Sequence, residues 1–144
     1  DFDVMLPAAA QGALAVEIAD PARVGVRDLV RQLDHPPTRA RVTAERQFLR
    51  VLEAGCLAPV GVHAAVDSAH DSGVDLTMAA VIGRTLFNGS VAEGSEAPLL
   101  RMTEAAAKEQ PAELGSRMAR EALQRINDDQ SSEPAPGPRG TERE

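Results

Sequence analysis

The sequence predicts an α+β fold, in which a three-stranded antiparallel sheet is combined with about three helices. Two segments in the first half of the chain, and one near its end, place apolar residues at helical spacing. Between them lie short runs rich in valine and alanine, separated by turn residues. Because turn signals join these runs, the pattern predicts three antiparallel strands.

A short apolar run, "GALAVEI" at residues 12–18, predicts a buried strand, although its alanines and leucine also permit a helix. It has no obvious partner among the other expected strands. We therefore expect residues 1–19 to form a hinge and the last strand of an upstream α/β domain. The chain begins with Asp1 rather than Met, which also favours interpreting the sequence as a fragment.

The first predicted helix spans residues 20–33. Asp20 can cap it, and Pro21 suits the first helical position. Gly25 is its weak point, because glycine is a poor helix former. One face carries the apolar residues Val26, Leu29, Val30 and Leu33.

The second predicted helix spans residues 34–55. Pro36 and Pro37 lie before or in its first turn, where proline is tolerated. Gly55 stands where a helix commonly ends in the left-handed conformation. The residues expected to face the core are Val42, Phe48, Leu49 and Leu52.

Strands are predicted after Pro59. Residues 60–69 and 74–83 are strand-like, and "HDSG" between them is a turn signal. Residues 84–94 are expected to supply the remaining strand, either as a hairpin at Asn88-Gly89 or as one strand interrupted by a turn.

The last predicted helix spans about residues 111–126. Beyond it, from Asp128, the chain has no large apolar residue and cannot bury enough surface to offset its conformational entropy. We therefore expect a domain at residues 20–127 and a disordered tail at 128–144. The apolar stripe of the last helix comprises Leu114, Met118, Ala119, Ala122, Leu123 and Ile126.

Composition excludes several function classes. The net charge is −7 and aromatic residues make up 2% of the chain, which argues against a nucleic-acid-binding domain. No apolar run is long enough to span a membrane, so no membrane association is expected. The single cysteine cannot form an internal disulfide, which fits a reducing compartment.

Few residues have the pattern of a reactive site. Cys56 follows a helix C-terminus, where the helix dipole disfavours a thiolate, so local chemistry favours a small buried residue over a redox cysteine. The alternative interpretation is that Cys56 is an exposed thiol with small neighbours. The three histidines show no metal-ligand spacing, and no metal site is predicted. The arginines of residues 39–50 are either a solvated helix face, the favoured interpretation, or an anion site.

Two separated stretches resemble one family. "MLPAAAQGALAVE" (residues 5–17) is similar to the segment LPA-x-GQGA-x-x-x-E of porphobilinogen deaminases, also called hydroxymethylbilane synthases. "RVTAERQFLRVLEAGCLAPVGVHA" (residues 41–64) resembles the same family's cofactor-attachment signature, and the spacing between the two stretches also fits. The resemblance covers most of residues 4–127.

The resemblance implies an enzyme. The family comprises transferases of tetrapyrrole (heme and porphyrin) biosynthesis, which polymerise porphobilinogen into hydroxymethylbilane on a dipyrromethane primer. By motif alignment, Cys56 would hold this cofactor through a thioether, with Gly55 beside it. Gln11 and Gly12 would line the cleft between domains near the cofactor. Residues 20–127 would be the third domain, and the strand at 12–18 would return to the first.

The resemblance also implies what this chain lacks. The family's catalytic aspartate and substrate-binding arginines lie in upstream domains, so no catalytic residue is expected here and the chain alone should be inactive. The complete protein is expected to be a cytoplasmic monomer whose upstream domains are the chain's partners.

Two residues depart from the family pattern. Ala10 and Ala54 stand where the family usually has glycine. If either position needs a positive φ, alanine costs about 1 kcal/mol. A degenerate family member is therefore one alternative. The other is a non-catalytic α+β module for partner binding or regulation, with Cys56 as a buried structural residue.

Overall fold

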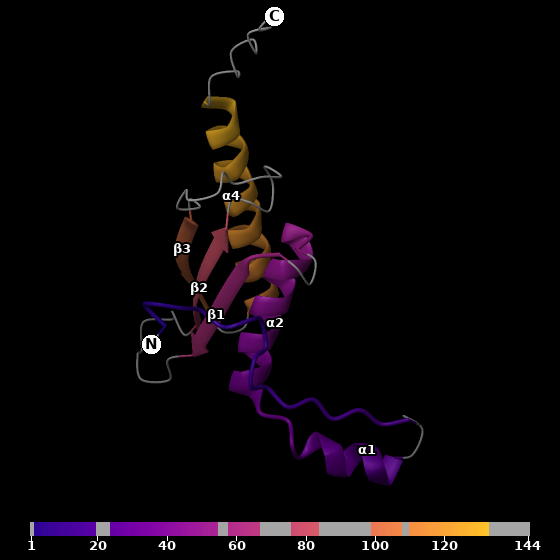
Figure 1. Ribbon diagram of the computed structural model, residues 1–144. Coiled ribbons are helices and arrows are strands. Elements are labelled where there is room, and N and C mark those ends of the chain that lie inside the picture. Colours follow the sequence, from indigo (N-terminus) through magenta and orange to yellow (C-terminus); the bar gives the residue numbers. More distant parts are fainter. Residues whose placement is uncertain are drawn as a thin grey trace, which may run out of the picture.

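A computed structural model describes residues 2–19, 24–54, 58–66, 76–83, 99–107 and 110–132. Figure 1 shows a sheet with two long helices packed beside it, and one short helix lying apart from both. The predicted α+β class is confirmed. The elements, in chain order, are α1 (Val24–Arg31), α2 (Pro36–Leu52), β1 (Val60–Val66), β2 (Leu76–Gly83), β3 (Leu99–Ala106) and α4 (Pro111–Ser132).

The sheet is antiparallel in the order β1-β2-β3, with β2 in the centre. Side chains alternate across its two faces, as the period of a strand requires. On β2 the alternation places Leu76, Met78, Ala80 and Ile82 in the core, all with no exposed surface. The flanking strands contribute fewer core residues, namely Val62 and Ala64 of β1 and Met102 of β3.

The core lies between this face of the sheet and the helix pair α2 and α4. Phe48 of α2 and Met118 of α4 are fully buried there, and the predicted stripe of α4 is confirmed. The two helices come into close contact at Gly115. A Cβ there would clash with the carbonyl oxygen of Ala44 and would lie 3.0 Å from the amide nitrogen of Phe48. Glycine is therefore required at this crossing.

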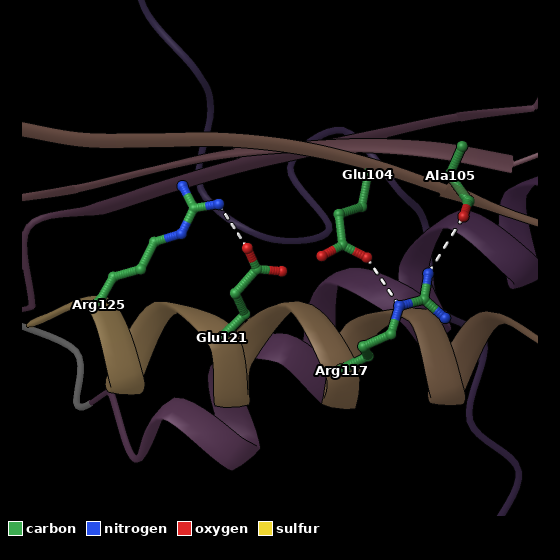
Figure 2. Close-up of polar contacts among 5 residues, drawn as sticks. All are labelled: Glu104, Ala105, Arg117, Glu121 and Arg125. Carbon is green, nitrogen blue, oxygen red and sulfur yellow. Dashed lines mark hydrogen bonds and ion pairs between the residues drawn. The ribbon is translucent and has the colours of Figure 1, made fainter.

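Polar contacts join the exposed side of α4 to β3. Figure 2 shows the Arg117 guanidinium between the Glu104 carboxylate and the carbonyl of Ala105. The Nε–Oε2 distance between Arg117 and Glu104 is 2.8 Å. Glu121 lies one turn beyond Arg117 and pairs with Arg125 of the same helix. Such exposed ion pairs each contribute up to about 1 kcal/mol, so the pair between Arg117 and Glu104 orients β3 more than it stabilises the fold.

The third strand of the described sheet is β3, at Leu99–Ala106, a segment for which the sequence predicts no strand. The strand predicted at residues 84–94 lies outside the described residues. The sequence of β3, "LLRMTEAA", is rich in good helix formers, and Met102 is its one buried residue. Its strand conformation comes from pairing with β2, a tertiary effect that local propensity does not predict.

The predicted strand at residues 12–18 does not form a strand within this chain. Leu14 is 97% exposed and Val16 is 57% exposed. The neighbouring α1 is a helix, as predicted, but none of its residues is buried. Most apolar residues of this region are therefore exposed in the described part of the chain, while Ile18 and Val30 are partly buried.

Helix ends differ from the prediction at two places. The left-handed residue that terminates α2 is Glu53, with φ 56°, rather than Gly55, which lies outside the described residues. The helix stops at Leu52 because the Glu53 and Ala54 amides already bond back to its last carbonyls. At the other end of the chain, α4 continues to Ser132, past the expected end near Ile126.

Candidate functional site

Residues 8–13, which we call the QG loop, contain the predicted site residues Gln11 and Gly12. The loop is two successive turns: the Gln11 amide donates to the carbonyl of Ala8 at 3.1 Å, and the Ala13 amide donates to Ala10 at 3.0 Å. Ala10 and Gly12 have positive φ angles of 61° and 83°. Ala10, one of the two departures from the family pattern, thus occupies a position that favours glycine.

The carboxylate of Glu45 holds the QG loop. It is 4% exposed, and its two oxygens accept hydrogen bonds from two different parts of the chain. Oε2 accepts from the Ala10 amide at 2.7 Å, and Oε1 accepts from the Ala64 amide on β1 at 2.8 Å. One side chain of α2 therefore connects the loop to the sheet.

The segment before the loop covers the free edge of β1. The Val62 amide donates to the carbonyl of Pro7 at 2.8 Å, and Leu6 is 9% exposed. Gly61 permits this approach, since a Cβ there would lie 2.8 Å from the Leu6 carbonyl oxygen. The QG loop is thus anchored on its N-terminal side as well as by Glu45.

Arg41 and His63 complete the wall beside the loop. The Arg41 Nε donates to the carbonyl of Ala64. Phe2 stacks on the His63 ring with centroids 4.0 Å apart. Partial burial, and then the nearby Arg41 charge, lower the pKa of His63 below its usual value, so its ring is neutral near pH 7.

Two cavities adjoin the QG loop. A small one of about 160 Å³ lies between Gln11, Thr38 and Arg41. A larger groove of about 1010 Å³ runs between residues 9–18, α1 and α2. Its lining is mainly apolar, but Arg27, Arg31, Arg39 and Arg46 also reach it. Asp34 also lines the groove and pairs with Arg39 at 2.8 Å, and Arg27 and Arg31 lie 3.7 and 3.9 Å from the Asp28 carboxylate, so the groove carries charges of both signs.

The other predicted site residues, Cys56 and Gly55, lie outside the described residues. The described chain stops at Ala54, just after α2, and resumes at Ala58. Ala54 does not have a positive φ; in the described part of the chain, the non-glycine residues with one are Ala10 and Glu53. At a rise of about 1.5 Å per residue, the eight positions from Glu45 to Glu53 span about 12 Å along α2.

Comparison with known proteins identifies the family. A sequence model described as porphobilinogen deaminase, C-terminal domain, matches residues 39–124, which is more than half of the chain. The chain belongs to the porphobilinogen deaminase family. The described domain accordingly has the three helices and three-stranded sheet that the resemblance implied.

Curated relatives agree with this family. The porphobilinogen deaminase of Moorella thermoacetica is 39% identical over 127 residues, which are 87% of this chain and 38% of that protein. That of Mycobacteroides abscessus is 42% identical over 120 residues, 83% of this chain and 37% of that protein. The protein from Thermobifida fusca is 55% identical over 64 residues, 44% of this chain and 20% of that protein. The chain thus spans little more than a third of the Moorella and Mycobacteroides proteins.

Glu45 is the site residue that the sequence analysis missed, because it was assigned no role beyond a charged helix face. Its neighbours could have signalled burial: Ala44 and Phe48 place position 45 next to the apolar side of α2. Among the described residues, no group of three potential metal ligands gathers, and no helix is both long and apolar enough to cross a membrane.

Proposed function

We propose that this chain is the C-terminal part of a porphobilinogen deaminase, an enzyme of tetrapyrrole biosynthesis that polymerises porphobilinogen into hydroxymethylbilane. In this proposal Cys56 holds a dipyrromethane cofactor through a thioether, while Gly55 leaves room beside it. The observation that carries the proposal is the docked QG loop: Glu45 holds Gln11 and Gly12 against the same helix that leads to Cys56.

The described residues fit such a cofactor. Gly12 faces open space, because a Cβ built there would meet no atom within 4 Å. Arg46 of α2 lines the adjoining groove and follows Glu45 in the sequence, and it would suit the negative charges of pyrrole acetate and propionate groups. The bound cofactor would supply the primer on which new pyrrole units are added.

In this arrangement the residues of this chain bind and orient the cofactor, and the catalytic groups lie elsewhere. Gln11 is held against its own loop, because its side-chain Oε1 accepts the Ala8 amide at 3.1 Å. The QG loop, fixed in this way, would form one wall of the cofactor cleft. The catalytic acid and the main substrate-binding arginines would come from upstream domains, which we propose as partners of this chain in a monomeric protein.

The exposed segment at residues 12–18 supports an upstream partner. Its apolar side chains, Leu14 and Val16 among them, remain in solvent here, and large exposed apolar surface is costly for a folded protein. We place these residues as the last strand of the first domain in the complete enzyme. Residues 1–19 would then be the hinge and that strand, and 20–127 the cofactor-attachment domain.

The proposal is tested on the full-length protein that contains this chain. Its intact mass should exceed the sequence mass by two pyrrole units, and Cys56→Ser should remove both the adduct and porphobilinogen consumption. Thr77→Ser, an equally small change on the exposed face of β2, is the control and should keep both. An unmodified protein with an unreactive thiol would favour the non-catalytic module instead.

The purified 144-residue chain provides a second test. It should consume no porphobilinogen, because the proposed catalytic groups lie upstream. Measurable turnover by this chain alone would contradict that division of labour between the domains.

A further inference from the structure

Glu45 is an unusual residue to find in a protein core. Burying a carboxylate costs several kcal/mol unless hydrogen bonds replace its lost hydration. Here they do so at 2.7 and 2.8 Å, from two backbone amides. An apolar residue at this position would leave both amides without their acceptor. The role of the carboxylate is therefore tied to the two backbone groups that it binds.

The two donors identify what the carboxylate does. Ala10 lies 35 residues before Glu45 and Ala64 lies 19 residues after it, so one side chain of α2 joins the QG loop to β1. Ala10 also has the left-handed conformation, with φ 61°, so the chain turns at the residue whose amide binds Glu45. A backbone hydrogen bond to a charged acceptor is among the stronger ones in proteins, and it is directional.

We infer that Glu45 is a positioning residue of the enzyme: its carboxylate sets the orientation of Gln11 and Gly12 relative to the helix that leads to Cys56. This inference rests on the proposed function. In this role Glu45 acts through its hydrogen bond to the Ala10 amide, not through a bond to the reacting groups. The loop itself supplies little packing, since Ala8, Gln11 and Gly12 are exposed, so its geometry depends on its anchors.

Glu45→Gln tests the inference in the full-length protein. Glutamine has the same shape, but its single oxygen can accept only one of the two amides, and its NH2 group then faces the other donor. We expect kcat to fall by about 10- to 100-fold, because the QG loop, which forms one wall of the site, would be misplaced. The change in KM should be smaller. The dipyrromethane adduct on Cys56 should still appear in the intact mass.

Gln47→Ala is the matched control. Gln47 lies on the same helix, and its side chain donates to the Ser116 hydroxyl of α4 at 2.7 Å, away from the QG loop. Its loss should lower the melting temperature and leave kcat unchanged at temperatures where both variants are folded. If Glu45→Gln behaves in the same way, or keeps wild-type kcat, the residue is purely structural and the inference is wrong.

If Glu45→Gln does not fold, hydrogen exchange of the backbone amides in the wild-type protein tests the inference instead. The Ala10 amide should exchange at least about tenfold more slowly than the neighbouring exposed Gly12 amide, because a charged acceptor protects it. Equal exchange at the two positions would overturn the inference. A wild-type enzyme without adduct or activity would instead contradict the proposed function, independently of how Ala10 exchanges.

Discussion

Helices α4 and α1 carry the same kind of sequence pattern and have opposite environments in the structure. In α4, the apolar residues Leu114 and Met118 have no exposed surface, because the helix packs against α2 and the sheet. In α1, Leu29 is 65% exposed, and no residue of the helix is buried. Figure 1 shows α1 lying beyond the start of α2, away from the sheet.

The difference shows that helical periodicity predicts an apolar face but not the surface that covers it. The face of α4 finds its partner within this chain. The face of α1, with Val26 and Leu33 also exposed, borders the groove along residues 9–18 and would be covered by upstream domains in the proposed enzyme. The substitutions below measure this contrast.

The largest effect is expected from a matched pair of leucine truncations. Leu114→Ala should lower the free energy of unfolding of this chain by about 3 kcal/mol, because it leaves a cavity in the core. Leu29→Ala should change it by less than about 0.5 kcal/mol, since this side chain is already in solvent. Urea denaturation of both variants measures the difference, and equal losses would mean that α1 is packed after all.

A matched pair of glycine substitutions should have opposite signs. Gly115→Ala should destabilise the chain by about 1–2 kcal/mol, because its Cβ forces α4 away from the α2 backbone. Gly25→Ala meets no atom within 4 Å and should stabilise α1 locally by about 0.5–1 kcal/mol. Urea midpoints report the first change, and amide exchange within α1 reports the second. Destabilisation by Gly25→Ala would reveal a close neighbour of α1.

The smallest effect concerns pH and the wall of the site. The pKa of His63 is lowered in the folded chain, so the unfolded chain binds a proton at higher pH than the folded one. Stability from this group is complete above the unfolded value of 6.5 and is lost as the pH falls through 6.5 toward the lower folded pKa. Melting temperatures between pH 8 and pH 5.5 should therefore fall more in wild type than in His63→Gln. Parallel pH profiles would contradict this assignment.

Much of the fold followed from local sequence. The α4 stripe, the prolines at the start of α2 and the two strands β1 and β2 lie where their patterns predict them. On α2, Phe48 and Leu52 face the core as predicted, whereas Val42 lines the groove. Local sequence does not predict β3, because its residues favour a helix and only pairing with β2 makes them a strand. The end of α2 was also misplaced, since Glu53 adopts the left-handed conformation that glycine was expected to supply.

For the candidate site, the sequence identified residues, and the fold decided which of them lie close together. The resemblance singled out Gln11, Gly12, Gly55 and Cys56, and the departure at Ala10 proved to be a position of positive φ. Nothing in the sequence paired Ala10 with Glu45, because 35 residues separate them and a carboxylate beside an arginine-rich helix face resembles any solvated charge.

The sequence by itself therefore determined which segments are helical, which strands form a hairpin-like pair and which family the motifs resemble. These properties depend on side-chain periodicity and on short runs of neighbouring residues. Tertiary structure alone decided that Leu99–Ala106 is a strand, that α1 is left uncovered and that Glu45 is a buried link between loop and sheet. Each of these depends on contacts between residues far apart in the chain, whose energies outweigh local preference.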